Sequence, residues 1–235
     1  MSEWKPKRFW NAATVQEGEE GFSVTLDGRP VRTPAKAELQ LPTRAMAEAI
    51  AAEWDAQENV VDPLTMPFTR SANAAIDKVR TQHAEVADML AGYGDSDLLC
   101  YRATYPDALV ARQAAEWDPA LDWAEAALGA RLVPVAGVVH QPQDPGALER
   151  LKTLTHEMDA FRLAAFHDLV GLSGSLVLGF AAARDWRDAQ EIWTLSRLDE
   201  TWQEEQWGRD EDAHAQAERK KAEFMHAKRF YDAAR

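Results

Sequence analysis

The sequence has a single cysteine, Cys100, among its 235 residues. One thiol cannot form an internal disulfide and cannot build a multi-cysteine metal site. A protein without disulfides is typical of a reducing compartment. The first ten residues also lack the apolar stretch of a secretory signal. Together these absences predict a cytoplasmic protein.

Long hydrophobic runs are absent as well. The longest uncharged apolar run is LVGLSGSLVLGFAAA, residues 169–183. It is shorter than the roughly 20 residues that a membrane-spanning helix needs. We therefore expect no membrane insertion. A helix that is apolar on all sides at this length is typical of a protein core, and we predict that this run forms the central buried helix of a helical domain.

Basic residues are outnumbered, with 26 Lys and Arg against 39 Asp and Glu, for a net charge of −13. Nucleic-acid binding requires clustered Lys and Arg that neutralise phosphates. The charge balance therefore excludes nucleic acid as a partner, and it disfavours an anionic membrane surface. Acidity itself bears on solubility and on the choice of partner rather than on fold.

The first forty residues have the pattern of β structure. In residues 21–34, GFSVTLDGRPVRTP, apolar and polar side chains alternate around Asp27–Gly28, a favoured two-residue hairpin turn. A tight turn at this point pairs Val24 with Val31 on one face. The alternation in residues 37–42, through Leu39 and Leu41, predicts another short strand.

From residue 44 the hydrophobic period changes. Met46, Ile50 and Trp54 recur every four residues, which predicts an amphipathic helix over residues 44–59 that buries all three side chains. Thr43 is in the position of an N-cap.

Helical patterns dominate the rest of the chain. Helices are predicted from Pro67 to about Met89 and then over 107–128, 145–170, 172–183, 185–206 and 209–234. A Gly- and Pro-containing stretch, residues 128–146, interrupts them and favours a short strand. The predicted fold class is α+β, with a small β-rich N-terminal domain (1–75) that contains the hairpin and a larger all-α helical domain (76–235).

Two fragments resemble catalytic signatures but are incomplete. HEMDA, residues 156–160, begins like the zinc-protease H-E-x-x-H motif, but Ala160 replaces the second histidine. GLSGS, residues 171–175, ends in Ser175 instead of the last glycine of G-x-S-x-G. Close packing of two helices explains the glycines of this region better: Gly171, Gly174 and Gly179.

Metal binding has one candidate region near the C-terminus. Glu211 with His214, and Glu223 with His226, form two Glu-x-x-His pairs of the kind found in di-iron bundles. The pairs are separated by twelve positions, about 18 Å along one helix, so they cannot meet at one metal pair. We therefore expect no metal. A metal-dependent hydrolase stays open as an alternative that would use Glu200, Glu205, Asp210 and His214.

Residues 199–212 hold seven carboxylates against one arginine, a local balance of −6, together with Trp202 and Trp207. A solvated helix face explains the charges. A recognition surface explains both the charges and the tryptophans, because aromatic residues are enriched at interfaces. A generic acidic scaffold with another partner also fits this composition.

Eight segments of the chain, in order from Arg8 to Ala213, resemble one protein family: RFWNAATV, VTLDGRPVRTPAKAELQLP, AIAAEWDAQ, MPFTRSANAAID, DLLCYRA, WDPALDW, GSLVLGFA and ETWQEEQWGRDEDA. The family is that of the assembly chaperones of the F-type ATP synthase, often called the "ATP twelve" family. Mitochondrial members carry a targeting extension that this chain lacks, so the chain looks like a bacterial member.

The resemblance implies a chaperone and no enzymatic activity, catalytic residue or cofactor. Members bind the unassembled alpha subunit and shield the surface that the beta subunit later covers. For this chain the resemblance implies transient binding of the alpha subunit by a monomer. The residues expected to contact this partner are Glu200, Trp202, Glu205, Trp207 and Asp212.

Overall fold

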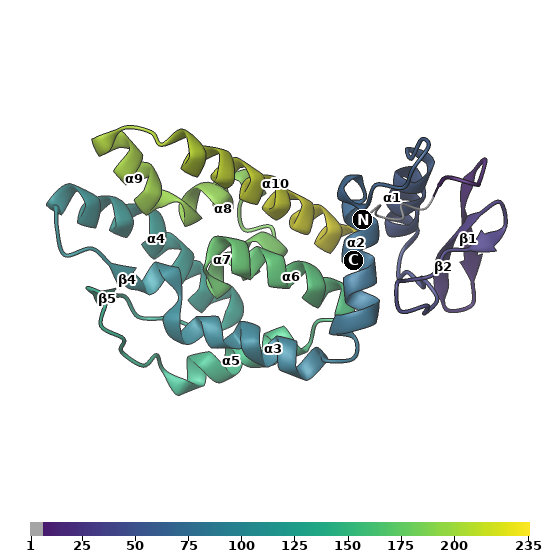
Figure 1. Cartoon of the computed structure of the whole chain (residues 1–235). Coiled ribbons are helices and arrows are strands. Elements are labelled where there is room, and N and C mark those ends of the chain that lie inside the picture. The colour runs from purple at the N-terminus through teal and green to yellow at the C-terminus, as the bar shows by residue number, and fades with distance from the viewer. Residues whose placement is uncertain (1–6) are drawn as a thin grey trace. The chain divides into compact units, whose positions relative to one another are not determined.

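The computed structural model describes residues 7–235, which form two compact units. The first unit contains the described residues up to His83, with Asp159–Ala165 and Arg229–Arg235. The second contains Ala84–Met158 and Phe166–Lys228. Strands lead the chain and helices follow (Figure 1). The predicted α+β class is confirmed, whereas a domain boundary after residue 75 stays a prediction.

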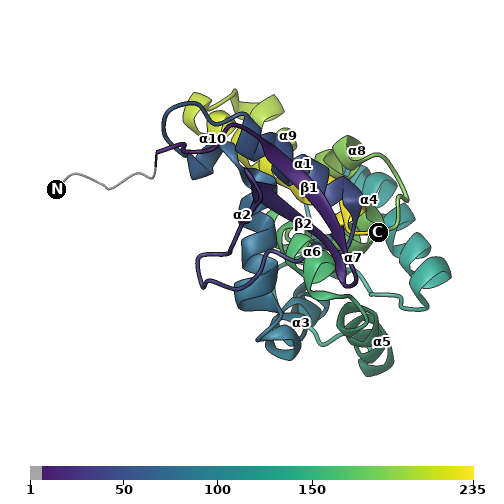
Figure 2. The ribbon, with the colours of Figure 1, turned by 90° about the vertical axis from the view of Figure 1, so that its right-hand side faces the viewer.

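The first unit is built on an antiparallel sheet with the strand order β1-β2-β3. The strands are β1 (Ala13–Gly18), β2 (Gly21–Leu26) and β3 (Arg29–Pro30). Figure 2 views this sheet with β1 and β2 side by side. The buried side of the sheet faces α1 (Arg44–Asp55), so strand and helix share one small core.

The predicted hairpin is confirmed. Leu26 pairs with Arg29 across a turn in which Asp27 and Gly28 have φ values of 48° and 81°. Positive φ at both central positions is what a type I′ turn requires. The Val31 N–H donates to the Val24 carbonyl at 2.9 Å, so the predicted pairing holds. The strand expected at Leu39 and Leu41 forms only isolated bridges, although both leucines are buried.

The helix predicted over residues 44–59 ends at Asp55. Thr43 is its N-cap, because its hydroxyl accepts the Met46 N–H at 3.2 Å. Met46 and Ile50 are fully buried, but Trp54 is only half-buried, with its ring edge-on to that of Trp10 at 5.2 Å. The helix ends early because the Gln57 side chain donates to the Glu53 carbonyl, which the next helical turn would otherwise use.

Helices make up most of the remaining chain. α2 (Pro67–Ala74) continues into a π-helical turn at Ala75–Val79, and α3 spans His83–Ala91. Short 3-10 turns lie at Pro63–Thr65, Gly92–Ser96 and Leu98–Cys100. The later helices are α4 (Asp107–Leu128), α5 (Pro145–His156), α6 (Ala160–Ser173), α7 (Leu176–Ala183), α8 (Ala189–Ser196), α9 (Leu198–Trp207) and α10 (Glu211–Ala233).

A short parallel ladder joins β4 (Tyr101–Arg102) to β5 (Val135–Ala136). β5 lies inside the stretch 128–146, where a short strand was predicted. The strand is therefore confirmed, and its partner is the segment that precedes α4.

Three of the helices predicted after residue 140 were also too long. The first, over residues 145–170, breaks where Asp159 accepts the N–H groups of Phe161 and Arg162 and starts α6. The second, over 172–183, starts only at Leu176, because Gly174 has φ 72° and Ser175 is the N-cap of α7. The third, over 185–206, is divided into α8 and α9 at Arg197.

The core of the second unit is centred on α7, all eight residues of which are buried. The apolar run of residues 169–183 therefore forms a buried centre, but as the end of α6 and α7 rather than as one helix. A Cβ on Gly179 would lie 2.6 Å from Val170 of α6, which confirms the close approach expected there. The expectation was wrong for Gly171, which has open space around it.

Asp97 is fully buried, and its carboxylate lies against the N-terminal end of α7. Its oxygens accept the N–H of Leu99 at 3.0 Å and the N–H of Val177 at 3.1 Å. Burial raises the pKa of Asp97 to about 6, because the charged form is poorly solvated, while these hydrogen bonds and one from Ser175 act in the opposite direction. The residue thereby links α7 to the segment that leads into β4.

Candidate binding groove

The second unit has an open groove with a volume of about 580 Å³. Four segments line it: the end of β4 with the residues that follow it, the first turns of α4, the turn after β5, and α9. The lining side chains include four aromatic residues: Tyr101, Tyr105, Trp202 and Trp207. Aromatic and apolar linings with a few polar groups are typical of binding sites.

A buried glutamine holds three of these segments together. The Gln113 side chain, on α4, accepts the Ala103 N–H at 2.8 Å and donates to the Asp199 carboxylate at 2.7 Å. Gln113 is almost inaccessible to solvent. Because buried polar groups are costly unless they are hydrogen-bonded, these two bonds define the spacing of β4, α4 and α9.

Arg102 and Trp117 support the part of the groove that β4 lines. The Arg102 guanidinium lies 5.3 Å from the centre of the Trp117 ring and bonds Asp118 at 2.8 Å and the Leu99 carbonyl at 2.6 Å. Trp117 is fully buried, and its indole N–H donates to the Leu195 carbonyl at 2.9 Å. These contacts attach Arg102, which lines the groove, to α4.

The mouth of the groove exposes large apolar side chains. Tyr105 is 80 % exposed, Trp207 is 79 % exposed and Val138 is 91 % exposed. Exposed apolar side chains that lie close together mark interaction sites, whereas single ones are common on any protein surface. The groove is therefore a candidate interaction site. Trp202, five positions before Trp207, is half-buried and lines the same groove.

The predicted partner-binding residues therefore divide into two groups. Trp202 and Trp207 line the groove, whereas Glu200 and Glu205 do not. Glu200 pairs with Arg197 at 2.6 Å on its own helix. Glu205 pairs with Arg112 of α4, also at 2.6 Å, and this hydrogen bond raises the pKa of Arg112. Partner binding by both glutamates stays a prediction.

Asp212 lies in the first turn of α10, beyond a turn at Gly208 with φ 89°. The Asp210 carboxylate accepts the N–H groups of Asp212 and Ala213, both at 2.9 Å, so Asp210 starts α10. Acidic residues at this end also favour the positive end of the helix dipole. Asp212 is exposed outside the groove, and its role in binding a partner stays a prediction.

Asp199 is the carboxylate that lines the groove, and it was not among the predicted partner-binding residues. One of its oxygens accepts from Gln113, and no basic side chain pairs with it in residues 7–235. Its position in the acidic stretch was visible in the sequence. Only the fold distinguishes it from Glu200 and Glu205, which have arginine partners.

Three of the four residues suggested for a metal-dependent hydrolase have other roles. Glu200 and Glu205 pair with arginines, and Asp210 begins α10. Among the described residues, no group of three or more His, Cys, Asp or Glu side chains is placed to hold a metal ion.

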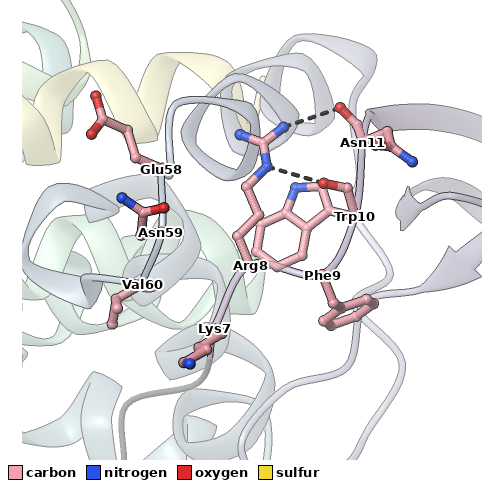
Figure 3. Close-up of a pocket in the computed structure, with 8 residues that line it drawn as sticks. All are labelled: Lys7, Arg8, Phe9, Trp10, Asn11, Glu58, Asn59 and Val60. Carbon is pink, nitrogen blue, oxygen red and sulfur yellow. Dashed lines mark hydrogen bonds between the residues drawn. The ribbon is translucent and has the colours of Figure 1, made fainter.

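The first unit has a second, more polar pocket of about 470 Å³ (Figure 3). Figure 3 shows Arg8 donating to the carbonyls of Trp10 and Asn11, both at 3.0 Å. Arg8 also bonds the carbonyls of Asp55 and Gln57. Its donors are thus used in joining the N-terminal segment to the end of α1, which is a structural role.

Comparisons with known proteins show the family of the chain. The family model described as "ATP12 chaperone protein" matches residues 7–125, just over half of the chain. The chain belongs to the ATP12 chaperone family. The mitochondrial protein atp12 of Schizosaccharomyces pombe is 28% identical over 222 residues, which cover 88% of this chain and 76% of the relative.

Two solved bacterial structures are similar along nearly the whole chain. Atp12 of Paracoccus denitrificans has 50% identity and a TM-score of 0.96, with 99% of this chain and 100% of that chain covered. The Atu1473 protein of Agrobacterium tumefaciens has 43% identity and a TM-score of 0.92, with 98% and 87% covered. These findings confirm the family resemblance and its bacterial type.

Membership of this family makes the chain a chaperone of ATP synthase assembly. A chaperone needs a surface that holds another polypeptide, and the aromatic groove is the candidate for this surface. No helix within residues 7–235 combines the length and the apolar character required to cross a bilayer.

Proposed function

We propose that the protein binds the free alpha subunit of the F-type ATP synthase and covers the surface that the beta subunit later occupies. The groove of the second unit holds the client, and the complex is transient and involves one copy of the chaperone. The observation that carries this proposal is the gathering of Tyr105, Val138 and Trp207, all exposed, around a groove that the carboxylate of Asp199 also lines.

The chemistry of the groove suits an unassembled subunit. A subunit surface that will later be buried exposes apolar side chains, and these aggregate unless they are covered. Trp202 and Trp207 offer large contact areas for such side chains. Asp199 has no basic partner among the described residues, so it is available for a Lys or Arg of the client.

Glu200 and Glu205 act differently in this proposal. Both are partly exposed and already paired with arginines, so they are less available than Asp199 for a direct contact with the client. The negative field around α9 comes from the excess of acidic over basic residues in 199–212. Such a field speeds the encounter with a basic surface and adds little affinity at high salt. The net charge of −13 extends this field over the molecule.

Binding of purified alpha subunit to matched variants tests the proposal. Trp207→Ala removes an exposed aromatic of the groove, and we expect at least tenfold weaker binding with an unchanged melting temperature. The control is Leu64→Ala, because Leu64 is also 79 % exposed but lies in the first unit. Its affinity should stay within about twofold of wild type. Equal effects of the two substitutions would contradict a role for the groove.

Charge reversal tests the negative field around α9. Glu200→Lys and Glu205→Lys, made separately, should slow association with the alpha subunit and reduce its dependence on salt. Measurements at low and high ionic strength separate this effect from a loss of folding, which a melting curve reports. Unchanged association in both variants would leave α9 as a solvated face.

A further inference from the structure

One side of α9 lines the groove along most of the helix. Asp199, Trp202, Gln203 and Gln206 occupy positions i, i+3, i+4 and i+7, and all four line the groove. Residues with this spacing lie on a single side of an α-helix. In a protein core such a stripe packs against another helix, but here it borders open space. We call these four residues the α9 stripe.

A second helix borders the same groove. α4 contributes Leu109 and Gln113, which are four positions apart and so lie on one side of α4. The two helices are joined at this place, because Gln113 donates to Asp199 at 2.7 Å and Arg112 donates to Glu205 at 2.6 Å. Figure 1 shows α9 and the first turns of α4 at the same end of the second unit. Two joined helices that border one groove leave a position in which the side chains of a third helix can pack between theirs.

The wall formed by β4 and the residues after it offers little to an extended ligand. The Ala103 N–H donates to the Gln113 side chain at 2.8 Å, and the Arg102 carbonyl accepts the Gly137 N–H at 2.8 Å. Pro106, which also lines the groove, has no N–H to offer. An extended ligand needs partners for its own N–H and C=O groups, whereas a helix pairs these groups internally. The backbone of the groove therefore favours a helix as its ligand.

The α9 stripe begins with a carboxylate and ends beside an exposed indole. Asp199 lies in the first turn of α9, and Trp207, which is 79 % exposed, is the last residue of this helix. The two are separated by about 12 Å along the helix, or roughly two turns. Between them, Gln203 and Gln206 are exposed, and their amides have no hydrogen-bond partner within residues 7–235. A helix that matches this stripe has a Lys or Arg on its contact side and large apolar side chains about two turns away.

We propose that the groove binds an amphipathic helix of the client, whose apolar side packs on Trp202 and Trp207 and whose Lys or Arg pairs with Asp199. This inference rests on the proposed function for the identity of the client. It restricts the bound part of the client to a helix with apolar residues at i, i+3, i+4 and i+7, the spacing by which helices are recognised in apolar grooves. The two tryptophans provide the contact area that such residues need.

Synthetic peptides test the shape of the ligand without the client. The helical probe has about 18 residues, which is long enough to form a helix. It carries leucines at i, i+3, i+4 and i+7, one arginine on the same side, lysines on the opposite side and alanine elsewhere. One control replaces a central alanine by proline, and a second distributes the leucines around the helix at unchanged composition.

Fluorescence polarisation of the labelled peptides measures their binding. Both controls should bind more weakly than the helical probe by about tenfold or more, because one cannot stay helical and the other has no apolar side. The bound probe should show helical ¹³Cα chemical shifts. Equal affinity of the probe and the proline control would overturn the inference, and equal affinity of the probe and the redistributed control would show attraction by charge alone, which also overturns it.

A matched pair of substitutions places the peptide on the α9 stripe. Gln206→Lys puts a longer, positively charged side chain on the groove side of α9, where it should repel the basic probe. Gln216→Lys adds the same charge at an exposed position of α10 outside the groove. Both variants should melt like wild type. Gln206→Lys should weaken binding of the helical probe by about fivefold or more, and Gln216→Lys by no more than about twofold. Equal effects of the two substitutions would contradict binding in the groove.

Cross-linking tests the same geometry with the alpha subunit. Gln206→Cys provides a thiol in the groove for a photoreactive label, whereas Cys100 is buried, and burial raises the pKa of its thiol to about 12, so it should not react. The positions cross-linked in the alpha subunit should recur every three or four residues, the spacing of one side of a helix. Recurrence at every second residue would show an extended ligand and would overturn the inference.

The outcomes separate the two proposals. Alpha subunit that binds the chaperone and is cross-linked with the spacing of an extended chain overturns the helix inference and leaves the proposed function intact. Failure of the alpha subunit to bind, with the helical probe still preferred over both controls, overturns the proposed function and supports the groove as a helix-binding site. Cross-links between two chaperone chains in the absence of a client would show that a second copy fills the groove, and they would overturn the assignment to a client.

Discussion

The carboxylate of Glu53, on α1, accepts two hydrogen bonds from Thr69 in the first turn of α2: one from its N–H at 2.8 Å and one from its hydroxyl at 2.7 Å. The Phe68 N–H donates to the other oxygen at 2.6 Å. Met66, at the N-cap position, gives α2 no side-chain cap. A residue of one helix thus caps the next, so the two helices are stabilised together.

Replacement of Glu53 tests this connection. Glu53→Ala leaves the first N–H groups of α2 without an acceptor and should lower the free energy of unfolding by about 1–2 kcal/mol. Glu53→Gln retains one oxygen acceptor and should cost less. Urea denaturation measures both. Glu48→Ala is the control on the same helix, since Glu48 is exposed, and it should change stability by no more than about 0.5 kcal/mol.

Two glycines of the same apolar run should respond in opposite directions to alanine. Gly179→Ala places a methyl group 2.6 Å from Val170, and we expect a loss of about 1–3 kcal/mol from overpacking. Gly171→Ala has open space and lies inside α6, so it should stabilise the protein by up to about 1 kcal/mol. Calorimetric melting of both variants gives the comparison, and a shift of the same sign in both would contradict it.

A charge in α7 should prevent folding. Leu176 is fully buried in a helix without a polar side chain, so Leu176→Asp buries a carboxylate that has no cation partner. We expect a loss of more than about 4 kcal/mol, seen as insoluble or unfolded protein in circular dichroism. Leu64→Asp makes the same change at an exposed site and should fold normally. A folded, soluble Leu176→Asp protein would show that α7 is not the core.

Asp97 gives the protein a specific dependence on pH. Its pKa is about 6 in the folded state against an ordinary value of 3.8, so the folded state binds the proton more tightly. Its contribution to stability is complete below pH 4 and is lost as the pH rises through 6. The difference in unfolding free energy between wild type and Asp97→Asn should therefore fall by on the order of 2–3 kcal/mol between pH 4 and pH 7.

Urea denaturation at one-unit intervals of pH measures this difference. Surface carboxylates such as Asp27 and Asp88, whose pKa values are lowered by their hydrogen bonds, make the protein more stable as the pH rises. They are present in both proteins, so the difference between wild type and Asp97→Asn does not contain their contribution. A difference that stays constant or grows with pH would contradict the assignment to Asp97.

Local signals in the sequence were sufficient to predict a helix end where the residues next to the helix stop it. α4 spans 107–128 as predicted, since Pro106 precedes it and Gly129, with φ 72°, ends it. The breaks before α6 and α7 also had local signs, in Asp159 and in the pair Gly174–Ser175. The break at Arg197 had none. α8 ends there although no glycine or proline lies next to Arg197 in the sequence, so tertiary packing decides where this helix ends.

The groove was less accessible to prediction than the helices. Its α9 wall was expected through Trp202 and Trp207, because tryptophans among acids are conspicuous in a sequence. The other walls come from β4, α4 and the turn after β5, and only the folded chain brings them together. Exposure of Tyr105 and Val138 has no sequence signature, and the pairing of Glu205 with Arg112 spans too many residues to be read from spacing.

The side-chain amide of Gln113 neither gains nor loses a proton in the pH range where proteins are stable. It accepts at one end, from Ala103, and donates at the other, to Asp199. A carboxylate could only accept when ionised, and an imidazole would exchange its roles as it titrates. The spacing of the three segments under the groove is therefore held by an amide whose hydrogen bonds have the same directions in acid and in neutral solution.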